Sequence, residues 1–198
     1  MEWYEEEVHE IEQRRQKDPP PAGMVVFYGS SSMRLWESLE DDFSGNGVVN
    51  LAFGGSTMAA CAWFFERLVA PCHPRSIICY AGDNDLGDGR SPEEVLASFR
   101  ELLVKVDAHF PTIPFTIMSI KASPSRWHLV DKIRYTNELM YREIEGRDNG
   151  HFIDVFSAML GSDGRPDDSL FLEDGLHVSR QGYMVWKRLL LDRSGDIF

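Results

Sequence analysis

The sequence is poor in cysteine and has no long apolar run. Its 198 residues include only three cysteines, Cys61, Cys72 and Cys79. Their number is odd and their spacing fits neither a zinc site nor a disulfide framework, so we expect buried, reduced thiols. The longest apolar runs hold about five residues, whereas a membrane-spanning helix needs about 18. The sequence therefore predicts no transmembrane helix.

Positive charge is also scarce. The chain has 20 Lys and Arg against 32 Asp and Glu, which gives a formal net charge of −12. Nucleic acids and anionic membrane surfaces repel such a chain, so neither is an expected partner. The N-terminus lacks the basic region and apolar stretch of a signal peptide, and we expect a cytoplasmic protein. Hydrophobic residues make up 43% of the chain and charged residues 26%, as in globular proteins.

The hydrophobic pattern predicts one α/β domain over residues 1–198. Residues 1–21 are expected to form an amphipathic helix, with Trp3, Val8 and Ile11 on its apolar stripe, followed by a proline spacer. Strand-like and helical patterns then alternate. The expected strands are 24–28, 47–53, 76–80, 114–120 and 151–155, and the expected helices are 33–42, 57–69, 91–109, 125–145 and 179–191. This alternation predicts a doubly wound, five-stranded parallel sheet within three α/β/α layers.

Ligands of such sheets bind beyond the carboxyl ends of the strands. Motifs with polar residues follow three of the predicted strands, and Ser119-Ile120-Lys121 lies at the end of the fourth. The first is the Gly29–Ser32 loop, where a serine at a helix start suits a nucleophile, a phosphate contact or a simple helix cap. The second is Gly54-Gly55, which can offer a bare backbone N–H or form a plain turn. The third contains Asn84, a candidate donor to an oxyanion or the first residue of an Asx turn.

Asp174 and His177 lie three residues apart near the C-terminus. At this spacing the carboxylate can reach the imidazole, hold one tautomer and stabilise the imidazolium form. The other ring nitrogen then stays free for proton transfer. A surface Asp–His pair without a catalytic role is the alternative interpretation of the same spacing.

Taken together, these motifs resemble the conserved blocks of the SGNH, or GDSL-type, hydrolases. YGSSSMRLW is similar to block I, with Ser31 in the nucleophile position, and NLAFGGST is similar to block II, with Gly55 as the oxyanion glycine. Gly82–Asp85 is similar to block III, with Asn84 as the oxyanion amide, and Asp174–His177 is similar to block V. The blocks occur in the family's order between residues 24 and 186.

The resemblance implies a flavodoxin-like SGNH hydrolase fold and an esterase that needs no metal or cofactor. In this family pattern His177 removes the proton of Ser31 as that oxygen attacks the carbonyl, and Asp174 orients His177. The N–H groups of Ser31 and Gly55 and the amide of Asn84 bind the oxyanion. The implied substrate is a small-molecule acyl ester. The absence of a lid-like apolar insertion favours short acyl groups.

Two positions depart from the family pattern. Ser30 and Ser56 stand where the family usually or often has Asp, at positions that are not catalytic. These replacements bear on substrate preference and loop rigidity more than on the reaction. We further expect Met33, Trp36 and Asp83 to line the substrate site, although Met and aromatic residues of a helix belong more often to the core.

Two other functions remain open at this point. An apolar strand followed by Asp83-x-Asp85 is similar to the nucleophile motif of magnesium-dependent phosphatases of the haloacid-dehalogenase type, although no Thr follows the second Asp. The other alternative is a non-catalytic module that binds an anion at the Gly29–Ser32 loop.

Overall fold

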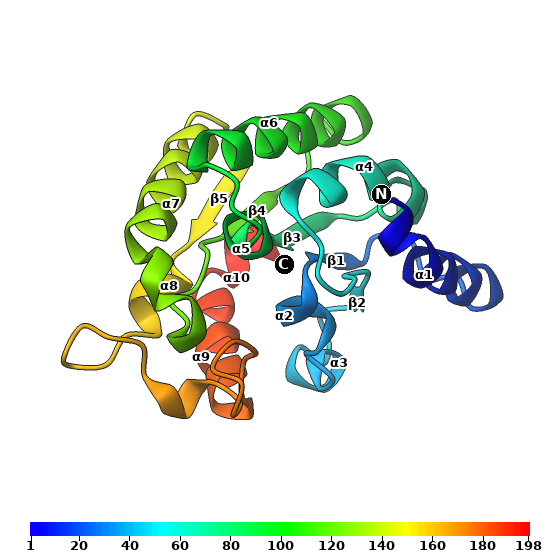
Figure 1. Ribbon diagram of the computed structural model, residues 1–198. Helices are drawn as coiled ribbons and strands as arrows, with labels where there is room; N and C mark the ends of the chain where they lie inside the picture. Colours follow the sequence, from blue (N-terminus) through cyan, green and yellow to red (C-terminus); the bar gives the residue numbers. More distant parts are fainter.

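A five-stranded parallel sheet forms the centre of the computed structural model, which describes residues 1–198 (Figure 1). The order of the strands is β2-β1-β3-β4-β5, and every neighbouring pair is parallel. This doubly wound order confirms the predicted fold class. The strands are β1 (Val25–Gly29), β2 (Val48–Asn50), β3 (Ser76–Tyr80), β4 (Phe115–Met118) and β5 (Gly150–Ile153).

Helices cover both faces of the sheet and enclose two apolar cores, of 32 and 21 buried residues. The larger core lies under α1 (Glu5–Lys17), α4 (Met58–Leu68), α6 (Pro92–His109) and α7 (Val130–Glu145). The smaller core lies under α2 (Ser31–Arg34), α3 (Leu39–Asp42), α8 (Val155–Ala158), α9 (Arg180–Leu191) and α10 (Ser194–Ile197). The remaining elements are α5 (Asp83–Gly87) and the 3-10 turns η1 (Glu2–Tyr4), η2 (Ala70–Cys72), η3 (Pro124–Leu129) and η4 (Asp168–Leu170).

The inner strand β1, which pairs with β2 and β3, shows why the strand sequences are continuously apolar. Successive side chains of a strand point to opposite faces, so Val26 and Tyr28 enter the larger core while Val25 and Phe27 enter the smaller one. Because both faces are covered, every residue of β1 is buried. Such a strand has no solvent-facing positions for polar residues.

Side-chain caps set the beginning of three predicted helices. Ser91 Oγ accepts the Glu94 N–H at 3.2 Å, and the Glu94 carboxylate accepts the Ser91 N–H at 2.7 Å. With Pro92 in the first helical position, this capping box starts α6 where the sequence predicts. Thr57 and Ser179 cap α4 and α9 through their hydroxyl groups.

Some predicted elements differ from the structure. The expected helix 33–42 is broken into α2 and α3, because the intervening Trp36 turns into the core, where its ring stacks on Tyr183. The regular part of the second strand ends at Asn50, and the expected helix 125–145 begins as the 3-10 turn η3. The prediction that Trp3 lies on the buried apolar stripe of the first helix is wrong, since the residue is 87% exposed.

The three cysteines are free and buried, as the composition predicts. Each lies in the larger apolar core. Burial raises the pKa of the Cys72 thiol, which keeps that group protonated at neutral pH. No helix of the structure combines the length and the apolar character needed to cross a membrane.

The buried carboxylate of Asp42 ties α3 to α9. It accepts hydrogen bonds from Trp36 Nε1 at 2.8 Å and Ser38 Oγ at 2.7 Å. It also pairs with Arg180 and with Lys187 of α9. The hydrogen bonds, that of Arg180 foremost, hold the pKa of Asp42 well below its usual value. The carboxylate is therefore charged in the folded protein.

We expect Asp42→Ala to lower the free energy of unfolding by about 2–3 kcal/mol at pH 7, because the Trp36 N–H loses its buried acceptor. A carboxyl group whose folded pKa is lowered stabilises the protein above its unfolded pKa and loses that effect as the pH falls. The difference from wild type should therefore shrink below about pH 4. Urea unfolding at pH 7 and pH 3 measures this difference in the free energy of unfolding. The control is Asp41→Ala, which changes an exposed neighbour. A difference that grows in acid would contradict this assignment.

Candidate active site

Ser31 begins α2 directly beyond the carboxyl end of β1. The chain leaves the strand at Gly29, whose φ is +129° and where a Cβ would lie 1.9 Å from the Tyr80 carbonyl oxygen. Only glycine fits this position. The Ser30 N–H donates to the same carbonyl at 2.9 Å and fixes the turn against β3. Ser31 is thus the first helical residue, where a backbone N–H has no partner within the helix.

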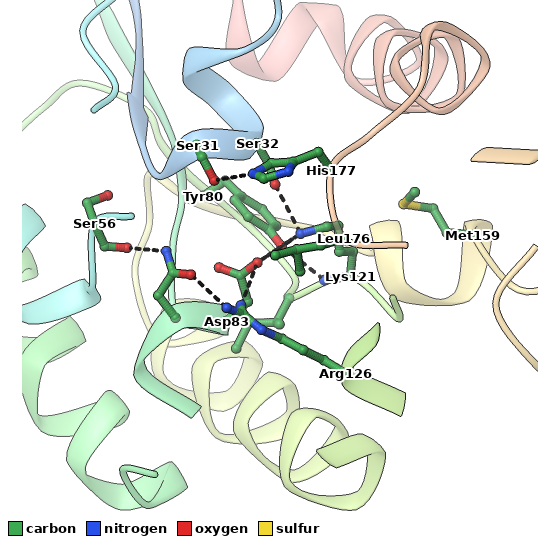
Figure 2. A network of polar contacts seen from close by, with 12 residues as sticks. Ser31, Ser32, Ser56, Tyr80, Asp83, Lys121, Arg126, Met159, Leu176 and His177 are labelled. Atoms are coloured by element: carbon green, nitrogen blue, oxygen red, sulfur yellow. Dashed lines mark hydrogen bonds and ion pairs between the residues drawn. The ribbon is translucent and has the colours of Figure 1, made fainter. Parts of the chain in front are cut away.

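The loop between η4 and α9 brings Asp174 and His177 to Ser31. Asp174 Oδ1 accepts the N–H groups of Leu176 at 2.8 Å and His177 at 2.9 Å, which closes a tight turn. Asp174 Oδ2 lies 2.5 Å from His177 Nδ1, and His177 Nε2 lies 3.2 Å from Ser31 Oγ. Figure 2 shows the His177 ring facing Ser31. The carboxylate favours the tautomer with hydrogen on Nδ1, which leaves Nε2 as an acceptor.

The Asp174 carboxylate stays charged at neutral pH. Its hydrogen bonds with the His177 side chain and with the N–H groups of the turn lower its pKa to about 2, although partial burial opposes this. An ionised carboxylate at this position stabilises positive charge on the imidazole. The arrangement can therefore move a proton from Ser31 to His177.

Three candidate oxyanion donors stand after β1, β2 and β3. The N–H groups of Ser31 and Gly55 donate to no acceptor within the protein. Gly55 has a φ of +64°, a conformation that favours glycine. Asn84 lies in the first turn of α5, where its Nδ2 donates to the Ser56 carbonyl at 3.0 Å and keeps a second hydrogen. The sequence does not predict α5 as a helix.

The N-terminal segment holds the Gly54–Gly55 turn from outside, a role that sequence reasoning missed. Glu7 accepts the Gly54 N–H at 2.7 Å, and the Tyr4 hydroxyl donates to the Gly55 carbonyl at 3.3 Å. Glu7 also pairs with Arg34 at the end of α2. The two peptide units that flank the Gly54–Gly55 unit are thus fixed, and the Gly55 N–H lies between them.

A buried ion pair lies next to the nucleophile helix. Lys121, only 1% exposed, follows β4, and its Nζ lies 2.8 Å from Asp83 Oδ2 and 3.0 Å from both Ser32 Oγ and the Tyr80 hydroxyl (Figure 2). Burial lowers the pKa of Lys121, while the charge of Asp83 opposes that change. Burial raises the pKa of Asp83, but its cationic neighbours outweigh this and the value lies below the usual one.

The structure corrects the three residues expected to line the substrate site. Met33 and Trp36 are 0% and 1% exposed within the smaller core. The Trp36 indole N–H is already occupied by Asp42. Asp83 is buried against Lys121. The apolar side chains follow the usual preference for the core, and the carboxylate is directed inward because its cationic partners lie there.

The carboxylates of Asp83 and Asp85 contact different partners, and this arrangement tests the phosphatase alternative. Asp83 faces Lys121 and Arg126. Asp85 Oδ2 accepts the Met58 N–H at the start of α4, at 2.8 Å. Burial raises the pKa of Asp85 to about 6. The proposed phosphatase motif would need both carboxylates in one reaction site, and this arrangement does not support it.

Comparison with known proteins decides the family. Residues 22–185 match the model of the GDSL-like Lipase/Acylhydrolase family. The chain belongs to this family. It is an ester hydrolase of the GDSL class, as the sequence predicts. It is 27% identical over 174 residues to the platelet-activating factor acetylhydrolase IB subunit alpha1 of Bos taurus, over 84% of this chain and 72% of that protein. The Homo sapiens protein of the same name is also 27% identical over 174 residues.

Solved structures share the fold of this GDSL-family chain. A Streptococcus pneumonia structure superposes with a TM-score of 0.84 at 19% identity, covering 96% of this chain and 94% of that one. A GDSL-like lipase from Bacteroides thetaiotaomicron gives 0.76 at 18% identity, covering 93% and 95%. A mutant acetyl-xylooligosaccharide esterase from Geobacillus Stearmophilus gives 0.70 at 16% identity, covering 89% and 96%.

Proposed function

We propose that this protein is a serine acylhydrolase in which Ser31 is the nucleophile, His177 the base and Asp174 the residue that orients the base. The observation that carries the proposal is the continuous contact from Ser31 Oγ through His177 to the ionised Asp174. His177 Nε2 takes the Ser31 proton while Oγ forms a bond to the acyl carbon. The resulting imidazolium is stabilised by Asp174.

Three hydrogen-bond donors stabilise the negative charge of the tetrahedral intermediate. The backbone N–H groups of Ser31 and Gly55 and the second Nδ2 hydrogen of Asn84 bind the carbonyl oxygen as it becomes charged. His177 then returns its proton to the alcohol oxygen, and the carbon–oxygen bond of the ester breaks. Water, with His177 as base, hydrolyses the acyl-enzyme to the free acid and Ser31.

The acyl group in this proposal is short, with acetyl as the first candidate. Two similar proteins are named for acetyl groups, the platelet-activating factor acetylhydrolase subunit and the acetyl-xylooligosaccharide esterase. A cavity of about 640 Å³ between α1 and β2 has charged side chains such as Glu10, Arg14 and Glu40 in its wall, and its lining includes neither Ser31 nor His177. That cavity does not suit a long acyl chain attached at Ser31.

A panel of p-nitrophenyl esters tests the proposal, with acetate, butyrate and octanoate as acyl groups. We expect kcat/KM to fall at least about tenfold from acetate to octanoate, since a pocket matched to a short chain rejects added methylenes. The values of kcat/KM for acetylated xylooligosaccharides and for an acetylated glycerophospholipid are then compared, since the names of the similar proteins suggest these two kinds of alcohol. A preference for octanoate would contradict the short-chain proposal. A protein inactive on every ester would contradict the serine mechanism.

A further inference from the structure

The orientation of the Asn84 amide is dictated by Arg126. Arg126 Nη2 donates to Asn84 Oδ1 at 2.9 Å. Because a guanidinium can only donate hydrogen bonds, the amide must place its oxygen, not its nitrogen, at this position. Asn84 Nδ2 is then directed to the Ser56 carbonyl, 3.0 Å away, and one N–H remains unused.

Arg126 is itself confined on two sides. Its Nη1 lies 3.3 Å from Asp83 Oδ2, and its side chain is only 18% exposed. Its guanidinium also lies against the backbone of Gly87, where an added Cβ would be 3.1 Å from Arg126 Cζ. Such a contact is tighter than ordinary packing. Gly87 therefore provides the space that the guanidinium occupies.

The same network includes the candidate oxyanion donor Asn84 and reaches the residues next to the other two donors, Ser31 and Gly55. Lys121 binds Ser32, next to Ser31, and pairs with Asp83. Asp83 pairs with Arg126, which binds Asn84. Asn84 in turn binds the carbonyl of Ser56, next to Gly55. Figure 2 shows Lys121 and Arg126 approaching Asp83 from different directions.

We propose that Arg126 is a positioning residue of the oxyanion hole, an inference that rests on the proposed serine mechanism. It fixes the Asn84 amide so that one N–H is available to the developing negative charge, and it does not itself contact the substrate. Without Arg126 the amide can rotate and present its oxygen instead, which would repel the oxyanion. Donors held in place before the reaction stabilise the transition state without reorganisation.

A double-mutant cycle on Arg126 and Asn84 tests this inference with p-nitrophenyl acetate. Asn84→Ala should lower kcat roughly 10²–10³-fold, the usual loss of one oxyanion donor. Arg126→Met should lower kcat roughly 10–100-fold with KM nearly unchanged, because the contact matters only in the transition state. In the Asn84→Ala background, Arg126→Met should lower kcat by less than about twofold, since the side chain that Arg126 positions is already absent.

A boronic acid that forms a tetrahedral adduct with the serine provides a readout besides turnover. Its affinity should fall in Arg126→Met by a factor similar to that in kcat/KM, and by less than about twofold in the Asn84→Ala background. Arg134→Met is the matched control, because the Arg134 guanidinium lies over the rings of Trp127 and Phe156 and belongs to no part of this network. It should retain wild-type kcat.

Gly87→Ala keeps every side chain of the network and displaces only the guanidinium. Gly87→Ala should also lower kcat in the wild-type background and have little effect on kcat in the Asn84→Ala background. If Arg126→Met does not fold, Gly87→Ala alone tests whether Arg126 positions the Asn84 amide. An equal loss in both backgrounds, or no loss in either, would overturn the inference for Arg126. An active wild type with such an additive cycle leaves the serine mechanism standing, whereas an inactive wild type overturns both proposals.

Discussion

Ser31→Ala is expected to lower kcat at least about 10⁴-fold and to abolish covalent labelling by a phosphonofluoridate. The substitution removes the one hydroxyl that lies 3.2 Å from His177 Nε2, so no oxygen is left to form the acyl-enzyme. The slow activity that remains should come from direct attack of water on an ester whose carbonyl oxygen is still bound by the oxyanion donors. Turnover of p-nitrophenyl acetate and mass spectrometry of the labelled protein measure the two effects.

The neighbouring serines supply matched controls for Ser31. Ser30 is fully buried and its hydroxyl has no hydrogen-bond partner, so Ser30→Ala should keep both activity and labelling. Ser32→Ala removes a contact of Lys121, but the labelled hydroxyl of Ser31 stays in place. If Ser30→Ala or Ser32→Ala lost labelling while Ser31→Ala retained it, the nucleophile would be the serine whose substitution abolished labelling.

Asp174→Asn is expected to lower kcat by up to about 10⁴-fold while the protein remains folded. The amide oxygen can still accept the N–H groups of Leu176 and His177 and preserve the turn. The amide nitrogen, however, would donate to His177 Nδ1 and shift the ring hydrogen to Nε2, where it meets Ser31 as a donor. Steady-state kinetics and circular dichroism measure the two properties. Glu173→Gln, an exposed neighbour, is the control and should behave as wild type.

The pH profile separates the roles of Asp174 and His177. Activity of the wild type should fall in acid because a protonated His177 cannot accept the Ser31 proton. Protonation of Asp174 does not contribute to this loss above about pH 4, since its pKa is lowered to about 2. A wild type that keeps full kcat/KM in acid, or one that EDTA inactivates and magnesium restores, would contradict the assigned base.

The sheet was predictable because its signals are local. Buried strands such as β1 are apolar throughout, and the capping box at Ser91 places the start of α6 within the sequence itself. Strand ends were harder to predict because hydrogen bonding between the strands sets them. Leu51 and Phe53 still bond to the backbone of β1 beyond the regular part of β2. The broken helix around Trp36 likewise depends on a ring from α9, far away in sequence.

The sequence by itself determined the strand-and-helix order and the motifs that bring Ser31, Gly55 and Asn84 to the carboxyl edge of the sheet, since parallel strands end on one side. Only the tertiary structure decided what supports those groups. Arg126 and Asn84 are 42 residues apart, Glu7 and Gly54 are 47 apart, and the pairs follow no spacing rule. Contacts between distant segments depend on how the helices pack over the sheet, and no local pattern of residues encodes them.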